Sequence, residues 1–317
     1  MKKIKHLFTR SLKPIETEEP IALLVFRPIS FVLALVLKPT PIHPNIVTIV
    51  SMACGIITGY FYFNLHTYPA YYAAFALFIT HTLDCVDGQL ARIKGLSSRL
   101  GKTLDGIADI ITYIAIFGGV AYAISHNGQN GELHWTVYAL FALFNYQIHI
   151  HMFDHFKNEL IHYSIPEYHE KLESIDRLKR IYRNLGHSLA ARGYKVVLFF
   201  YIGFYIIERA VIRLAQPNDY QGFLEWYYQN NNIPASVKKH FRTHYRHYNW
   251  CLVRGWSMLG ATTHVSVFLV CTLLNRLDLI FWIICVPFNI WTLFLVICQR
   301  IIIRIQLNKA FKAGRIS

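Results

Sequence analysis

The chain has 317 residues, of which 54% are hydrophobic, 15% aromatic and only 16% charged. Soluble globular proteins carry about 25% charged residues, so this composition excludes an intrinsically disordered chain and favours an integral membrane protein. Lys and Arg together number 32 and Asp and Glu 18, which makes the formal net charge +14. Such an excess suits anionic lipid headgroups or phosphorylated substrates, and we expect no nucleic-acid partner.

Six segments are long and apolar enough to cross a bilayer. No Asp, Glu, Lys or Arg occurs between Lys38 and Asp84, where two spans of about 20 residues are separated by a turn at 64–69. Four further segments without these charges lie at 110–131, 133–153, 255–275 and 279–299. The sequence therefore predicts an all-α polytopic membrane protein, built as a bundle of six transmembrane helices.

The loops predict the orientation, because Lys and Arg accumulate on the cytoplasmic side of a membrane. The N-terminal segment, the 92–102 loop and the C-terminal tail are basic, whereas the turns at 64–69 and 126–134 contain no Lys or Arg. Six spans with both termini in the cytoplasm satisfy this pattern. The 92–102 loop is then cytoplasmic as well.

Two other apolar stretches are expected to form helices that do not span. The 21–37 stretch is interrupted by Arg27, which predicts an interfacial helix. The 196–207 stretch is followed by Arg209 and Arg213, and a seventh span here would place the basic tail outside. The predicted organisation is a cytoplasmic N-terminus and interfacial helix at 1–43, spans one to four at 44–154, a basic helical insert at 155–254, and two spans with a basic tail at 255–317.

Four aspartates are concentrated around the loop between the second and third predicted spans. Asp84 and Asp87 are three positions apart and Asp105 and Asp109 are four apart, so each pair shares one helix face. The short loop brings the two pairs together at the cytoplasmic boundary. Unpaired carboxylates would repel one another, and a hard divalent cation that also binds substrate phosphates removes the repulsion. The sequence therefore predicts a metal-diphosphate site.

Small and basic residues surround these aspartates. Gly88, Ala91 and Gly101 leave room for a flat base or a sugar beside the carboxylates. Arg92 supplies a planar cation that can bind phosphate through two hydrogen bonds.

Together these residues form the pattern DxxDGxxAR, then eight residues, then GxxxDxxxD. The pattern resembles the defining motif of the CDP-alcohol phosphotransferase family at all eight of its fixed positions. Upstream, Pro44, Asn45 and Thr48 also look like the start of that family's first span. The resemblance covers roughly residues 20–154 and, more weakly, the last two spans.

This resemblance implies a six-helix membrane enzyme of phospholipid biosynthesis, often a homodimer, that transfers a phosphatidyl or phosphoalcohol group from a CDP-alcohol to an acceptor hydroxyl and releases CMP. It implies Mg²⁺ or Mn²⁺, as two ions. Carried onto this chain, it makes Asp84, Asp87 and Asp105 metal ligands, and Asp109 the base and a further ligand. The residues that would line the CDP site are Gly88, Ala91, Arg92 and Gly101.

The sequence indicates the family more specifically than it indicates the donor and the acceptor. CDP-diacylglycerol with a small polar acceptor is favoured, because the basic cytoplasmic loops suit inositol phosphate or glycerol phosphate. CDP-choline or CDP-ethanolamine with diacylglycerol, and CDP-inositol with inositol phosphate, stay open. The basic, aromatic run at 238–254 fits a phosphorylated acceptor, anionic lipids or a solvated helix at the headgroups. Candidate contacts to the acceptor are His151, His155, Arg254 and His264.

The acidic and histidine-rich segments also allow other interpretations. The aspartates could form an ion-paired helix end with neighbouring Arg and Lys, but that would not require the glycines or the spacing. A divalent-cation transporter would place its acids near the bilayer midplane, whereas these lie at helix ends. A prenyltransferase also binds a diphosphate with aspartates, but lacks the DxxDGxxAR continuation. His240, His244 and His247 have zinc-like spacing without a completing Cys or carboxylate, which favours a surface helix.

Overall fold

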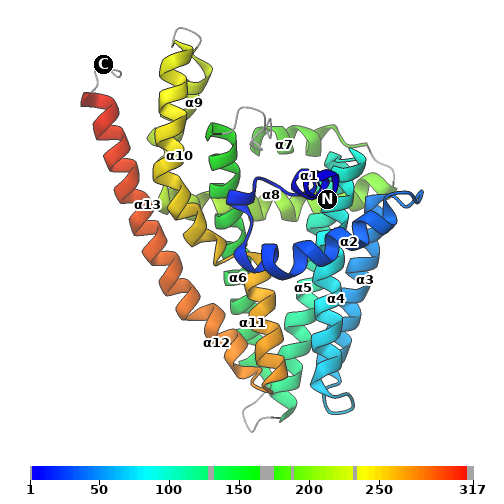
Figure 1. Ribbon diagram of the computed structural model, residues 1–317. Coiled ribbons are helices and arrows are strands. Elements are labelled where there is room, and N and C mark those ends of the chain that lie inside the picture. Colours follow the sequence, from blue (N-terminus) through cyan, green and yellow to red (C-terminus); the bar gives the residue numbers. More distant parts are fainter. Residues whose placement is uncertain (1, 128–131, 165–174, 187–188, 231–233, 313–317) are drawn as a thin grey trace. The chain divides into compact units, whose positions relative to one another are not determined.

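The computed structural model describes residues 2–127, 132–164, 175–186, 189–230 and 234–312, and it contains helices and no strand in these ranges (Figure 1). The predicted all-α class is confirmed for them. The helices are α1 (Lys2–Ser11), the 3-10 turn η1 (Ile15–Thr17), the π-helix η2 (Ala22–Phe26), α2 (Arg27–Leu37), α3 (Pro44–Phe63), α4 (Ala70–Lys94), α5 (Arg99–Asn127), α6 (Glu132–Ser164), α7 (Ile175–Asn184), α8 (Leu189–Ala215), α9 (Asn218–Gln229), α10 (Ala235–Ser257), α11 (Ala261–Leu273), α12 (Asp278–Cys285) and α13 (Pro287–Lys312).

Four stretches of the described residues are long and apolar enough to cross a membrane: Pro44–Phe63, Gly101–His126, Ser236–Leu273 and Asp278–Gln306. This finding confirms the expectation of several membrane-spanning helices. The predicted count of six is not confirmed, because the second and fourth predicted spans fall on α4 and α6. These helices carry no Lys or Arg in their apolar parts, but α4 ends in charged residues and α6 is rich in His, Asn and Gln. The 21–37 stretch forms the short apolar helix Ala22–Leu37, and its interfacial position stays a prediction.

The chain divides into two compact units. The first comprises 1–147 with 257–289, and the second comprises 148–256 with 290–317. The insert predicted at 155–254 lies within the second unit.

In the first unit, α3, α4 and α5 lie side by side, and α2 and α11 pack against α4 (Figure 1). Glycines allow the close approach of α3 and α5, as is common between membrane helices. A Cβ atom at Gly119 would lie 2.4 Å from the Gly59 carbonyl oxygen, and one at Gly55 would lie 2.5 Å from the Thr112 side chain. Any larger residue at these positions would force α3 and α5 apart.

The cytoplasmic ends predicted for α3 and α4 are tied together in the structure. Pro44 occupies the first turn of α3, where the missing N–H costs nothing, and α4 ends at Gly95, whose φ of +67° suits a glycine C-cap. Between them, Lys94 Nζ donates to the carbonyl oxygens of Thr40 and Ile42, both at 2.8 Å. The last turn of α4 is therefore held against the chain that leads into α3.

The second unit has a buried polar network around Glu159 of α6. Gln216 donates from Nε2 to Glu159 Oε1 at 3.0 Å, and the Tyr245 hydroxyl donates to the same oxygen. Glu159 is 2% exposed, and hydrogen bonding from other helices is what makes burial of such a group tolerable. The helical character predicted for the insert is confirmed by α7, α8, α9 and α10.

Candidate metal and nucleotide site

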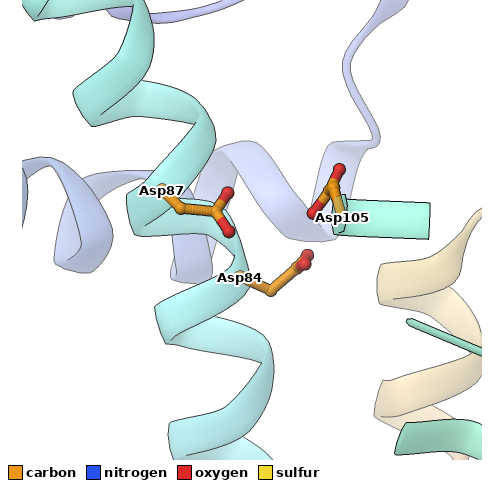
Figure 2. Close-up of side chains that lie close together, drawn as sticks. All are labelled: Asp84, Asp87 and Asp105. Carbon is orange, nitrogen blue, oxygen red and sulfur yellow. The ribbon is translucent and has the colours of Figure 1, made fainter. Parts of the chain in front are cut away.

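Three of the four predicted aspartates meet in the first unit. Figure 2 shows Asp84 and Asp87 projecting from neighbouring turns of α4 on the side where Asp105 of α5 lies. Each of the three offers a carboxylate oxygen, and these oxygens lie within 4.8 Å of one another. The three-residue spacing on α4 and the short connection to α5 therefore produce the cluster that the sequence predicted.

One of these carboxylates is oriented by α3. The Thr48 hydroxyl donates to Asp87 Oδ2 at 2.6 Å, and Asp87 is 6% exposed. Thr48 lies one turn after Pro44. In the sequence, this segment was linked to the site only because it resembles the start of the family's first span. The structure gives this threonine a physical role, which is to hold one Asp87 oxygen.

The ligand chemistry of the cluster fits a hard divalent cation. Asp84 and Asp105 are half-buried and Asp87 is buried, so their mutual repulsion is only partly screened by water. A set of carboxylate oxygens is what Mg²⁺ and Mn²⁺ prefer, and it does not suit a soft metal.

Asp109 lies one turn beyond Asp105 on α5 and is not a member of the group of three. It is exposed, and together with Asp84 it lines a small cavity of about 10 Å³, which is room for about one water molecule. The same cavity is lined by His81, Thr80, Thr112 and Tyr113. Asp109 and Asp84 therefore border the same small space, which is large enough for a hydroxyl group.

The predicted small residues lie beside the aspartates. A Cβ at Gly101 would meet Asn45 Oδ1 at 3.1 Å and Ser98 Oγ at 3.2 Å, so glycine lets the start of α5 pass close to α3. A Cβ at Gly88 would lie 3.4 Å from Arg92 Nη2, and Ala91 is half-buried on the same helix.

Arg92 is hydrogen-bonded to the N-terminal segment. Its Nε donates to the Ser11 carbonyl oxygen, eighty-one residues earlier in the chain. The role of Arg92 toward CDP stays a prediction.

The four candidate acceptor contacts divide between the two units. His264 belongs to the first unit, where it is fully buried on α11. Its Nδ1 lies 2.9 Å from the Gly260 carbonyl oxygen, and its ring packs edge-on against Tyr146 and Phe288. These contacts are typical of a packed helix residue, and its role toward an acceptor stays a prediction.

The other three, His151, His155 and Arg254, belong to the second unit. His155 Nε2 lies 3.2 Å from Glu159 Oε2 and 3.2 Å from Gln216 Oε1. The Arg254 guanidinium lies 5.9 Å from the centre of the Trp250 ring, and His151 is half-buried. Their role toward an acceptor also stays a prediction.

Two residues near the cluster were not identified from the sequence. His81 precedes Asp84 by three positions, so the same helical spacing that paired the aspartates could have pointed to it. Glu19 lies in the N-terminal segment and contacts α11, and no local pattern marks it.

Comparison with known proteins agrees with the motif. Residues 41–160, which include all four aspartates, match the model of the CDP-alcohol phosphatidyltransferase family. A relative, the CDP-diacylglycerol–serine O-phosphatidyltransferase of Helicobacter pylori (strain ATCC 700392 / 26695), is 28% identical over 109 residues, which are 34% of this chain and 44% of that protein. The matched region thus spans less than half the length of that relative. The resemblance seen in the motif is confirmed over residues 41–160, which match the model of a family of phosphatidyltransferase enzymes.

Proposed function

We propose that the protein is a divalent-cation-dependent CDP-alcohol phosphotransferase of phospholipid biosynthesis. The observation that carries this proposal is the meeting of Asp84, Asp87 and Asp105, from two helices, within the residues that match the family. Asp105 reaches the other two aspartates from a different helix, and this meeting of motif residues supports a working site.

In this proposal, Asp84, Asp87 and Asp105 hold Mg²⁺ or Mn²⁺, as two ions, and Asp109 contributes a further ligand. Thr48 keeps Asp87 in its ligating orientation through the 2.6 Å hydrogen bond. Bound divalent cations would neutralise the diphosphate and the charge that develops on the leaving CMP.

Asp109 is the proposed base. It takes the proton of the acceptor hydroxyl, whose oxygen then forms a bond to the phosphorus distal to the cytidine. The bond from that phosphorus to the bridging oxygen breaks, and CMP leaves with the electron pair. The cavity between Asp84 and Asp109, with a volume of about 10 Å³, supports this role because it admits a hydroxyl group beside both carboxylates.

The CDP moiety is proposed to lie along the last turns of α4 and the start of α5. Gly88, Ala91 and Gly101 present little side-chain volume there, and Arg92 supplies a cation for a phosphate.

CDP-diacylglycerol is the proposed donor, and a small polar molecule is the proposed acceptor. The printed name of the Helicobacter pylori relative contains both CDP-diacylglycerol and serine, which supports this choice over a diacylglycerol acceptor. The proposal keeps His151, His155, Arg254 and His264 as acceptor contacts. It also keeps a homodimer with both termini and the active site in the cytoplasm.

The test is CMP release by the full chain purified in detergent with Mg²⁺. CDP-diacylglycerol, CDP-choline, CDP-ethanolamine and CDP-inositol are supplied in turn, each with serine, glycerol 3-phosphate, inositol phosphate or diacylglycerol. We expect metal-dependent CMP from CDP-diacylglycerol with one polar acceptor, and none from Asp105→Asn. CMP from no donor in folded protein would overturn the proposed activity, and CMP from another donor alone would overturn the proposed substrate.

A further inference from the structure

The N-terminal segment contacts α4 both before and after the turn that carries Asp84 and Asp87. Before that turn, the Phe26 ring meets the His81 ring edge-on, with centroids 4.7 Å apart. After it, Gln89 Nε2 donates to the Ser11 hydroxyl at 3.2 Å and to the Arg27 carbonyl oxygen at 3.3 Å. Asp84 and Asp87 therefore lie between two points at which α4 is anchored.

Ion pairing stiffens the N-terminal segment itself. Arg27 donates from Nε and Nη2 to Glu18 Oε2, at 3.0 and 2.9 Å, and Glu18 is 5% exposed. The backbone N–H of Lys13 donates to the other Glu18 oxygen at 3.1 Å. Hydrogen bonds between charged groups are stronger than those between neutral groups, so these contacts hold the segment in a defined shape.

The next residue, Glu19, joins this segment to α11. The Thr263 backbone N–H donates to Glu19 Oε2 at 3.1 Å, and Glu19 is 9% exposed. Thr263 lies in the first turn of α11, where N–H groups have no partner within the helix and a carboxylate is favourable. Gly260, the N-cap of α11, makes room for it: a Cβ there would lie 2.2 Å from the Glu19 carboxyl carbon.

α11 in turn contacts α4 one turn before the first metal ligand. Thr262 Oγ1 lies 3.1 Å from His81 Nε2, and both residues are buried. His81 and Asp84 are three residues apart on α4, which places them on neighbouring positions of one helix face. The contacts form a continuous path from Glu19 through Thr263 and Thr262 of α11 to His81 of α4, three residues before Asp84.

We propose that Glu19 is a positioning residue for the metal site: its carboxylate holds the start of α11, and α11 holds the turn of α4 that carries Asp84. The inference rests on the proposed function in one respect, which is that Asp84 binds the cation. Glu19 is not one of the three clustered carboxylates, so in this proposal its loss weakens cation binding through the placement of α4.

Mn²⁺ binding to the full-length protein in detergent, followed by the electron paramagnetic resonance of the free ion, tests this without turnover. We expect Glu19→Ala to raise the Kd for Mn²⁺ about fivefold, the size of effect that a lost helix cap produces. Glu19→Gln keeps an oxygen that accepts from Thr263 and is expected to recover most of the affinity. Gly260→Ala should weaken binding like Glu19→Ala, because its methyl group displaces the carboxylate. Gly118→Ala is the matched control, since a Cβ there meets no atom within 4 Å.

Combining Glu19→Ala with Gly260→Ala tests whether the two substitutions weaken Mn²⁺ binding by the same route. If the Gly260 methyl group acts by displacing the carboxylate, Gly260→Ala adds nothing once Glu19 is already alanine. Thr262→Val removes the contact between Thr262 and His81 and should also raise the Kd for Mn²⁺. This variant replaces Glu19→Ala in the test if Glu19→Ala does not fold. Unchanged Mn²⁺ affinity in these variants, or additive effects of the two substitutions, would overturn the inference alone. Wild-type protein that binds no Mn²⁺ would overturn the proposed metal site as well.

Discussion

Thr48 and Asp87, 39 residues apart in the chain, are joined by a hydrogen bond of 2.6 Å between two buried side chains. The donor sits in the first turns of α3 and the acceptor in the last turns of α4. The contact links the threonine that follows Pro44 and Asn45 to the aspartates of the longer motif. Two segments that look independent in the sequence are therefore parts of one site.

Removing the Thr48 hydroxyl should weaken cation binding. Thr48→Val keeps the shape of the side chain but leaves Asp87 Oδ2 without this donor, and a hydrogen bond to a charged group is worth about 1.5–3 kcal/mol. We expect the Mg²⁺ concentration for half-maximal CMP release to rise about tenfold or more. Thr48→Ser, which retains the hydroxyl, should stay within about threefold of the wild type.

The control for this prediction is Thr58→Val, on the same helix. Thr58 donates to the Cys54 carbonyl oxygen and lies 3.1 Å from the Thr80 hydroxyl, so it carries a buried hydroxyl without an aspartate partner. An equal shift in Mg²⁺ dependence for Thr58→Val and Thr48→Val would show that general packing, and not the Asp87 contact, is responsible.

Replacing a single ligand of the cluster should abolish turnover while leaving the protein folded. Asp84→Asn and Asp105→Asn each remove a charge from the set whose oxygens lie within 4.8 Å. Metal stabilisation of the reacting phosphates is worth several kcal/mol, so we expect kcat to fall about 10³-fold or more. Asp278→Asn is the control: Asp278 is 45% exposed and pairs with Arg276 at 2.9 Å, and a surface pair contributes little. Wild-type rates in either cluster variant would contradict the ligand assignment.

Substitution of Asp109 should lower kcat much more than it weakens the binding of donor or cation. Asp109→Asn keeps the size of the side chain and removes the proposed base, so kcat should fall about 10²- to 10⁴-fold. The KM for the donor should change by less than about threefold, and the Kd for Mn²⁺ should rise by less than the fall in kcat, because three other carboxylates still hold the cation. A large loss of Mn²⁺ affinity with little extra loss of kcat would instead make Asp109 chiefly a ligand.

The sequence predicts the acidic cluster well because helical spacing and a short connection decide it. Asp84 and Asp87 share a face of one helix by count alone, and Asp105 follows on the next helix. The Glu19–Thr263 contact joins residues 244 positions apart, and the His81–Thr262 contact joins residues 181 positions apart. No local period or composition reports such pairs, so α11 could not be placed against α4 before the structure was known.

The span count shows a different limit of sequence reasoning. Counting only Asp, Glu, Lys and Arg makes the first part of α6 a charge-free segment of bilayer length. The same segment contains Asn145, Gln147, His149 and His151, and polar uncharged groups also cost free energy in a lipid environment. α6 is therefore not among the four candidate membrane-spanning stretches of the described residues.

Two adjacent glycines of α5 provide a matched test of the α3–α5 contact. A Cβ at Gly119 would lie 2.4 Å from the Gly59 carbonyl oxygen and 2.9 Å from the Tyr62 Cβ, whereas a Cβ at Gly118 would meet no atom within 4 Å. Gly119→Ala should therefore destabilise the protein by about 1–3 kcal/mol, the usual cost of overpacking. Gly118→Ala should be neutral or stabilising by up to about 1 kcal/mol, because alanine favours helix over glycine.

Thermal unfolding in detergent, followed by the exposure of buried cysteines, measures both variants. Gly119→Ala should lower the midpoint by several degrees and reduce CMP release, because Asp105 and Asp109 are carried by the helix that must move away from α3. A further variant, Gly59→Ala, has its Cβ 2.6 Å from the Ala115 carbonyl oxygen and should behave in the same way. If Gly118→Ala and Gly119→Ala have equal midpoints, α3 and α5 are not in backbone contact, and the placement of Asp105 and Asp109 beside α3 must have another cause.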